Sequence, residues 1–410
     1  MRDSSRVEPE RPEWAKPDAF PAKPDGQADF GYVDSRGYLH GAESADQLAG
    51  IIARSPKPVD LVWAPESDRL IVPEEIPTLR KSLRLRQARQ AAKDLSDGWR
   101  MGLLFGGFLV WSLWAAWNHS DGNIESLYSH QLSGIAALLG FVFGVIPCYR
   151  GWKMKHHLTS SSESDLEAEI PEARFDAWLG MQRIHATWWL LGGLLVCGLG
   201  QIIVDSGRVH FEVSIVRAGL LKEVALSFPE QVDGRAWWRM LTAPMLHGNV
   251  VHFLLNAGGL LYLGRRCEIM ARWPHMLIVF IVAAWVGSLA SLHWIPNKIH
   301  VGASGGLMGL LGFVLVFEQL HPRLVPRSSK KRLLAGLLLM MVIGLLGMSF
   351  IDNAAHVGGL LAGMAYALIV FPASGSTTRP ESIKRDVVAG FCAAGVIVFA
   401  LCAACVKMSS

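Results

Sequence analysis

One stretch of the sequence reads Val-Gly-Ala-Ser-Gly-Gly-Leu-Met-Gly, from Val301 to Gly309, and it opens an apolar run that ends at Phe317. A serine flanked by glycines inside an apolar segment has two interpretations. Small residues four positions apart let membrane helices approach one another closely, and this is the commoner use of the pattern. The same glycines would also leave room around a serine nucleophile for a tetrahedral intermediate. The stretch alone favours packing, so the choice depends on whether Ser304 has a base and oxyanion donors elsewhere.

The composition is that of a membrane protein. The chain has 410 residues, of which 51% are hydrophobic and only 18% are charged, and its mean hydropathy is +0.29. An ordinary soluble domain is less apolar than this. The six cysteines lie in or beside apolar runs, without the spacing of a disulfide framework or a zinc site. We therefore expect small buried thiols, no metal site and no cofactor.

Nine apolar segments of roughly membrane-spanning length follow residue 100. They are Met101–Trp117, Leu132–Cys148, Trp188–Val204, Gly248–Leu263, Met276–Leu292, Gly302–Phe317, Leu333–Phe350, Asn353–Phe371 and Val387–Val406. The loops after the second, fourth, sixth and eighth segments carry clusters of lysine and arginine, whereas Asn118–Gln131 carries none. By the positive-inside rule, the amino terminus is predicted to be cytoplasmic and the carboxyl terminus to lie outside. The long loop Asp205–Met245 is predicted to hold an amphipathic segment in the outer interface.

The residues before the first span predict a tail, a small module and a basic segment. Residues 1–27 hold prolines among charges, a composition typical of disorder, and no apolar core of a signal peptide. Residues 28–79 predict a small cytoplasmic α/β module. Its expected elements are a hairpin around Asp34–Gly37, a helix capped by Ser44, and strands at Val59–Trp63 and Leu70–Val72. The basic segment Arg80–Arg100 is expected to lie along an anionic membrane surface.

Four polar side chains inside the predicted spans are candidates for chemistry, because polar groups are costly in lipid. They are His252, Asn256, Ser304 and His356. Their three spans all run from outside to inside in the predicted topology. At a rise of about 1.5 Å per residue, the four side chains converge at a similar depth below the outer surface. Singly, each could be a polar clamp between helices. Together they match a serine hydrolase, which needs a nucleophile, an imidazole base and oxyanion donors.

The helix of His356 also offers a place for the serine helix to pack. Gly359 and Gly363 are four positions apart and would present a smooth face, so an imidazole could come close to a serine on the neighbouring helix. His252 and Asn256 are likewise four apart, which puts both side chains on one helix face.

At these residues the chain resembles the rhomboid intramembrane serine proteases, over about Trp188 to Phe371. The motifs are Trp238-Arg239 followed by His247, His252 and Asn256; the G-x-S-G motif with Ser304; His356 with Gly359 and Gly363; and a G-x-x-x-E element at Gly264 and Glu268. The resemblance implies a Ser304–His356 catalytic dyad, with His252 and Asn256 stabilising the oxyanion. Met308 stands where the family often has an aromatic side chain on the catalytic imidazole, and a thioether can fill that space. Asp352, four positions before His356, is predicted to cap that helix rather than to complete a triad.

The resemblance implies an all-α polytopic membrane protein with a six-helix core. Two extra transmembrane helices precede the core and one follows it. The expected domains are a tail at 1–27, the module at 28–79, the basic segment and two extra helices at 80–187, the protease core at 188–371, and a linker with the last helix at 372–410.

The implied function is that of an intramembrane serine endopeptidase cleaving transmembrane segments near the outer membrane face. The alternative is an inactive rhomboid-like chaperone or adaptor, which loss of the serine or histidine would mark; the sequence has both. An H-E-x-x-H metalloprotease motif and paired aspartates within the spans are absent from the sequence. The expected partners are transmembrane substrates and the lipid bilayer, not nucleic acid. We expect a multi-pass protein of a bacterial inner membrane.

The loop charges yield a test of the topology. Single cysteines placed in Asn118–Gln131 and beside Trp237 should react with a membrane-impermeant thiol reagent added from outside, whereas cysteines in Arg323–Arg332 should react only after permeabilisation. If the Trp237 loop and Arg323–Arg332 were accessible from the same side, the argument that the four polar residues share one depth would be wrong.

Overall fold

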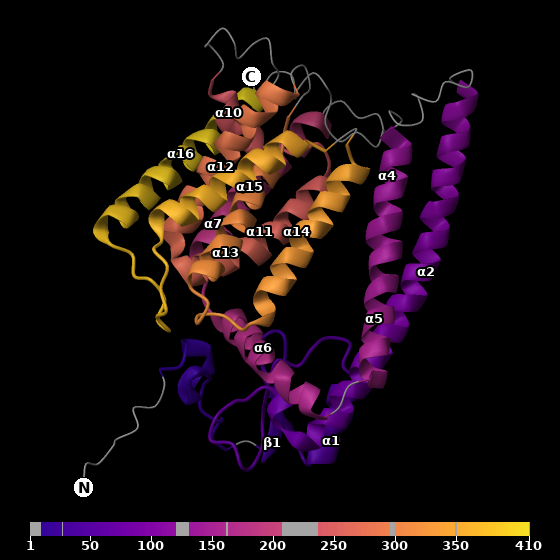
Figure 1. The fold of residues 1–410 in the computed structure, drawn as a ribbon, viewed down its shortest axis with the longest axis vertical. Coiled ribbons are helices and arrows are strands. Elements are labelled where there is room, and N and C mark those ends of the chain that lie inside the picture. Colours follow the sequence, from indigo (N-terminus) through magenta and orange to yellow (C-terminus); the bar gives the residue numbers. More distant parts are fainter. Residues whose placement is uncertain are drawn as a thin grey trace. The chain divides into compact units, whose positions relative to one another are not determined.

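A computed structural model describes residues 10–26, 28–119, 131–160, 163–206, 237–295, 300–348 and 351–409. The chain divides into two compact units, and each is considered by itself. The first comprises Met1–Met181 with Leu339–Ile351, and the second comprises Gln182–Leu338 with Asp352–Ser410. The described residues are mostly helical, apart from a small sheet near the amino terminus (Figure 1).

The first unit contains the predicted α/β module. Strand β1 (Phe30–Val33) pairs with β2 (Leu39–Ala42) and with β3 (Leu61–Trp63), both antiparallel, in the order β2-β1-β3. Helix α1 (Ala45–Arg54) covers this sheet, and its N-cap Ser44 Oγ accepts a hydrogen bond from Gln47 N at 3.2 Å. The structure thus has a hairpin and a capped helix at the positions where the sequence predicts them. The expected strand at Leu70–Val72 is reduced to a single bridge between Ile71 and Val62.

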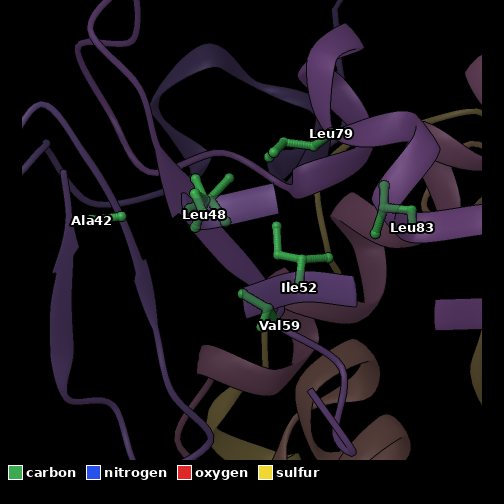
Figure 2. Close-up of a cluster of buried hydrophobic side chains, with 7 residues drawn as sticks. Ala42, Leu48, Ile52, Val59, Leu79 and Leu83 are labelled. Atoms are coloured by element: carbon green, nitrogen blue, oxygen red, sulfur yellow. The ribbon is translucent and has the colours of Figure 1, made fainter. Parts of the chain in front are cut away.

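A compact apolar cluster holds this module together (Figure 2). It joins α1, the sheet and the start of the next long helix. Its members are Ala42, Leu48, Ile52, Val59, Val62, Leu79 and Leu83. Because Leu48, Ile51 and Ile52 are spaced for one helix face, the sequence already indicated which side of α1 would be buried.

The predicted disordered tail is wrong over residues 10–26. This segment includes two short 3₁₀ helices, η1 (Glu13–Ala15) and η2 (Pro17–Ala19). Trp14 and Phe20 are buried, and Arg174 of α6 (Glu163–Met181) holds the segment by donating to Trp14 O at 3.3 Å and Lys16 O at 2.9 Å. The Arg174 guanidinium also lies 5.0 Å from the centre of the Phe20 ring. Two aromatic anchors thus outweigh a proline-rich composition.

The basic segment also differs from the prediction. Residues 80–100 do not form a separate surface helix; they are the first half of α2 (Arg80–His119), a single helix of 40 residues. No proline interrupts these 40 residues, so the helix of the span continues back into the module, where Leu83 is buried. The segment therefore continues the helix of the span, while its position relative to a membrane surface stays a prediction.

Helix α2 pairs with the next span through glycines. That span comprises α4 (Gln131–Gly140), a π-helical turn η5 (Phe141–Val145) and α5 (Ile146–Ser160). A Cβ added at Gly98 would lie 2.7 Å from Cys148 N, and one added at Gly144 would lie 2.8 Å from Gly102 Cα. The two backbones are therefore in direct contact, as small residues permit between membrane helices.

The second unit is a helical bundle (Figure 1). Its elements are α7 (His185–Ser206), α10 (Arg239–Thr242), η6 (Ala243–Met245), α11 (Val250–Ala271), α12 (Trp273–Trp294), α13 (Ser304–Leu320), α15 (Asn353–Val370) and α16 (Lys384–Ser409). Helix α14 (Ser328–Leu346) belongs to this unit up to Leu338. Most of the loop predicted to be amphipathic, residues 207–236, lies outside the described residues.

Each of the nine predicted spans coincides largely with helix in the structure. Six stretches of the described chain are long and apolar enough to cross a membrane. They are Pro77–Asn118, Ser133–Ser160, His185–Ile203, Trp273–Trp294, Asn353–Val370 and Lys384–Met408. The count of nine stays a prediction for α11, α13 and α14.

Buried charged groups fasten the helices of the second unit at several points. Glu268 accepts hydrogen bonds from Ala186 N at 3.0 Å and from Thr187 N at 2.8 Å, which satisfies the first turn of α7. His275 of α12 lies 3.6 Å from the carboxylate of Asp386 in the first turn of α16. The G-x-x-x-E glutamate thus caps a helix, and the helix that follows the core is tied to α12.

The closest approach in the bundle lies between α13 and α15. A Cβ added at Gly359 would lie 2.0 Å from Gly305 O, and one added at Gly363 would lie 1.8 Å from Gly309 O. Separations under 3 Å do not occur for real Cβ atoms, so only glycine fits at these positions unless the helices move apart. The glycine spacing predicted this packing.

Replacing a contact glycine should therefore separate the two helices. Gly363→Ala should lower the free energy of unfolding in detergent by about 1–3 kcal/mol, because an added methyl overpacks the interface. Gly192→Ala in α7, where nothing lies within 4 Å of the new Cβ, should be neutral or slightly stabilising, since alanine favours helix over glycine. Thermal unfolding followed by circular dichroism compares the two. Equal midpoints would contradict the described contact.

Candidate active site

Ser304 is the first residue of α13 and is half-buried. The backbone just before it is unusual, because Gly302 has φ +118°, a conformation that side chains disfavour. The Gly302 N–H donates to Ala243 O of η6 at 3.0 Å. This hydrogen bond fixes the backbone just before Ser304. The positive φ angle explains why the first residue of G-x-S-G is glycine.

His252 and Asn256 of α11 lie directly beside that approach. A Cβ added at Gly302 would be 2.7 Å from His252 Nε2 and 3.5 Å from Asn256 Nδ2. Glycine at position 302 therefore lets the two side chains come within van der Waals distance of the backbone leading to Ser304. The first turn of α11 is fixed by its N-cap, where Asn249 Oδ1 accepts from His252 N at 2.8 Å.

The Asn256 amide is a buried donor without a hydrogen-bond partner in the described part of the chain. Its side chain is 6% exposed, and Nδ2 has no acceptor. Leaving a buried donor unsatisfied costs about 1–3 kcal/mol. Such a cost is unusual in a folded protein, and this amide remains able to donate to an acceptor from outside the chain.

His247 supports the ring of His252 from the segment before α11. Its ring centroid lies 5.3 Å from that of His252, in edge-to-face geometry, and 5.2 Å from that of Phe253. Burial, with His252 beside it, lowers the pKa of His247 to about 3, so the ring is neutral near pH 7. Gln201 of α7 holds the same segment, because its side chain accepts from His247 N at 3.1 Å and donates to His247 O at 3.0 Å.

His356 lies in the first turns of α15. The N-cap is Asp352, whose Oδ1 accepts from Ala355 N at 2.9 Å, so the predicted cap is confirmed. Gly359, one turn after His356, contacts Gly305. Gly305 is the residue that follows Ser304. His252 lies against Gly302, three residues before Gly305. The four candidate residues named from the sequence are thus brought to one region of the bundle.

A cavity opens at this region. Its wall includes Ser304, Gly302 and Pro244, with Ala355 and Asp352 from the start of α15. The arrangement offers a hydroxyl on the wall of this space, amide and imidazole donors of Asn256 and His252 against Gly302, and the imidazole of His356 next in sequence to the lining residue Ala355. That combination suits acyl transfer, in which an alkoxide attacks a carbonyl and the developing negative charge needs donors.

The sequence reasoning missed other polar residues at the same place. Ser291 and His300 are buried beside Asp352. The available signal was a histidine four positions before Ser304, outside any apolar run. In the part of the chain that is described, no group of three or more histidine, cysteine or carboxylate residues could hold a metal ion.

Residues 234–373 match the Rhomboid domain family. RHOMBOID-like protein 6, mitochondrial, of Arabidopsis thaliana is 33% identical over 156 residues, which are 37% of this chain and 50% of that protein. Rhomboid protease GluP of Bacillus subtilis (strain 168) is 30% identical over 141 residues, 34% of this chain and 27% of that protein. Inactive rhomboid protein 2 of Homo sapiens is 31% identical over 172 residues, 42% of this chain and 19% of that protein. The chain spans half, or less, of the length of these relatives.

Proposed function

Because the Rhomboid domain at residues 234–373 makes this chain a member of the rhomboid family, we propose that it is an intramembrane serine endopeptidase with a Ser304–His356 dyad. The relatives support a membrane-embedded rhomboid but include both a named protease and named inactive proteins. Activity therefore has to be argued from the residues of this chain.

One observation carries the proposal. A buried amide donor without an acceptor, Asn256 Nδ2, lies beside Gly302, two residues before a half-buried serine. A structural clamp between helices would satisfy that amide, since its purpose would be the hydrogen bond itself. An oxyanion donor, in contrast, is poised for charge that develops only during the reaction.

The proposed reaction follows from these positions. Ser304 Oγ attacks the scissile carbonyl carbon while its proton passes to His356. The carbonyl oxygen becomes an oxyanion and accepts hydrogen bonds from His252, Asn256 and the Ser304 N–H. When the C–N bond breaks, His356 returns the proton to the leaving amine. Water then attacks the acyl-enzyme with His356 as base, which releases the new carboxylate and regenerates Ser304.

The site also suggests where in the membrane the reaction occurs. With a cytoplasmic amino terminus, α11, α13 and α15 all begin at the outer side, and His252, Ser304 and His356 lie in their first turns. Water would then reach the cavity from outside without crossing the hydrocarbon core. The substrates proposed are transmembrane segments that unwind near their outer end.

A bacterial inner membrane is the proposed location.

The first test separates a protease from an inactive relative. The purified protein in detergent is treated with a fluorophosphonate probe, which reacts with activated serines, and with a single-span substrate in liposomes. We expect labelling and cleavage by the native protein, and neither by Ser304→Ala. Native protein that bound transmembrane segments but was neither labelled nor able to cleave them would favour the chaperone or adaptor function.

The second test concerns the oxyanion donors. Asn256→Ala should lower kcat by about 10- to 1000-fold with little change in KM, because the lost hydrogen bond forms mainly in the transition state. Tyr262→Phe, on an exposed part of the same helix, serves as the control and should retain native turnover. If Asn256→Ala kept the wild-type kcat, Asn256 would have no part in the mechanism.

A further inference from the structure

A second group of buried polar side chains lies beside the candidate dyad and has no role in the reaction proposed above. His300 Nδ1 lies 2.7 Å from Asp352 Oδ2 and 2.8 Å from Ser291 Oγ. The Ser291 hydroxyl donates to the same carboxylate oxygen. Ser291 is fully buried and His300 is 7% exposed. Ser291 and His300 are thus largely removed from solvent, and both are bonded to Asp352, whose side chain is 17% exposed.

The hydrogen bonds of His300 leave it little freedom. Its Nε2 lies 3.1 Å from Ile295 O, and a carbonyl oxygen only accepts, so Nε2 carries a hydrogen. Its Nδ1 faces the carboxylate and a hydroxyl whose own hydrogen is already given to that carboxylate. The imidazole is therefore held at both nitrogens, in one orientation.

Asp352 links this group to the helix that carries His356. One oxygen, Oδ1, accepts from Ala355 N and caps α15, while Oδ2 binds His300 and Ser291. Both carboxylate oxygens are engaged by groups other than His356. Among the described residues, the hydrogen bonds of Asp352 go to Ala355, His300 and Ser291, which is not the arrangement of a triad.

The group joins the three parts of the fold that meet at the site. Ser291 lies in the last turn of α12, His300 begins the segment that leads to Gly302 and Ser304, and Asp352 opens α15. His300 is four residues before Ser304, and Asp352 is four residues before His356. The contact between His300 and Asp352 thus links the segment that leads to Ser304 with the segment that leads to His356.

We propose that Asp352, His300 and Ser291 form a positioning network that sets the separation of Ser304 and His356. The glycine contacts between α13 and α15 fix how closely the two helices approach. The network fixes how the first turn of α15 lies against the segment before α13, and therefore where the imidazole stands relative to the hydroxyl. This inference rests on the proposed proteolytic function, because it concerns the same two reacting groups.

The test uses substitutions that keep the helix cap but break the contact between His300 and Asp352. Asparagine caps helices about as well as aspartate, so Asp352→Asn retains the bond to Ala355 N while losing the charged partner of His300. His300→Gln breaks the same contact from the other side. The control is Asp386→Asn, which removes the other aspartate–histidine pair of the bundle, with His275, away from Ser304.

Four quantities are measured for each variant: kcat and KM for a single-span substrate, the rate of inactivation by the fluorophosphonate, and the thermal midpoint. Displacement of a reacting group by about 1 Å can cost on the order of 100-fold in rate. We expect Asp352→Asn and His300→Gln each to lower kcat and the inactivation rate by roughly 10- to 100-fold, with KM within about twofold. Asp386→Asn should change neither rate, even if it lowers the midpoint.

The double variant Asp352→Asn with His300→Gln decides whether the two residues act as one unit. Its kcat should be no lower than that of the worse single variant, because one contact can be broken only once. The inference is overturned if Asp352→Asn keeps native rates, or if the two effects multiply. A native protein that the probe fails to label would overturn the proposed function, and this inference with it; a labelled native protein with fully active variants would overturn the network alone.

Discussion

The direct contact between the backbones of α13 and α15 is the constraint on which the rest of the site depends. Packed helices usually have axes 8–10 Å apart, and a serine and a histidine are short side chains. Gly359 and Gly363 lie so close to α13 that any Cβ there would clash with the carbonyl oxygens of Gly305 and Gly309. This lets side chains from two helices share one cavity. The glycine-rich sequence around Ser304 thus serves helix packing, which is compatible with the proposed chemistry, and the two interpretations of it are not exclusive.

Buried polar groups in the second unit are of two kinds. Glu268 is satisfied by the first turn of α7, and Arg266 is paired with Glu318 and with Ser329. Asn256 Nδ2, by contrast, has no partner among the described residues, and neither ring nitrogen of the neighbouring His247 has one. Groups that hold the fold together are paired, as buried polar atoms generally are, whereas the unpaired amide of Asn256 lies against Gly302, two residues before Ser304. That distribution is what separates a candidate reaction centre from ordinary helix-to-helix hydrogen bonding.

Local patterns predicted much of this fold and the main candidate residues. Ser44 and Asp352 cap helices because their side chains can reach a backbone N–H within the same turn, and such contacts depend only on neighbouring sequence. The glycines four apart identified the α13–α15 interface for the same reason. The buried Trp14 and Phe20 could not be foreseen, because Arg174 lies about 160 residues away. His300 and Ser291 were missed since their partner Asp352 comes from a distant element, and no local periodicity marks such a contact.

The length of α2 has a mechanical consequence. Forty helical residues extend about 60 Å, roughly twice the thickness of the hydrocarbon core. Part of the helix must therefore extend beyond the hydrocarbon core. Leu83 belongs to the apolar cluster of the sheet. The amino-terminal module is therefore joined to the span by a continuous helix and not by a flexible linker. The helix that carries the module also makes the close contacts at Gly98 and Gly144 with the neighbouring span.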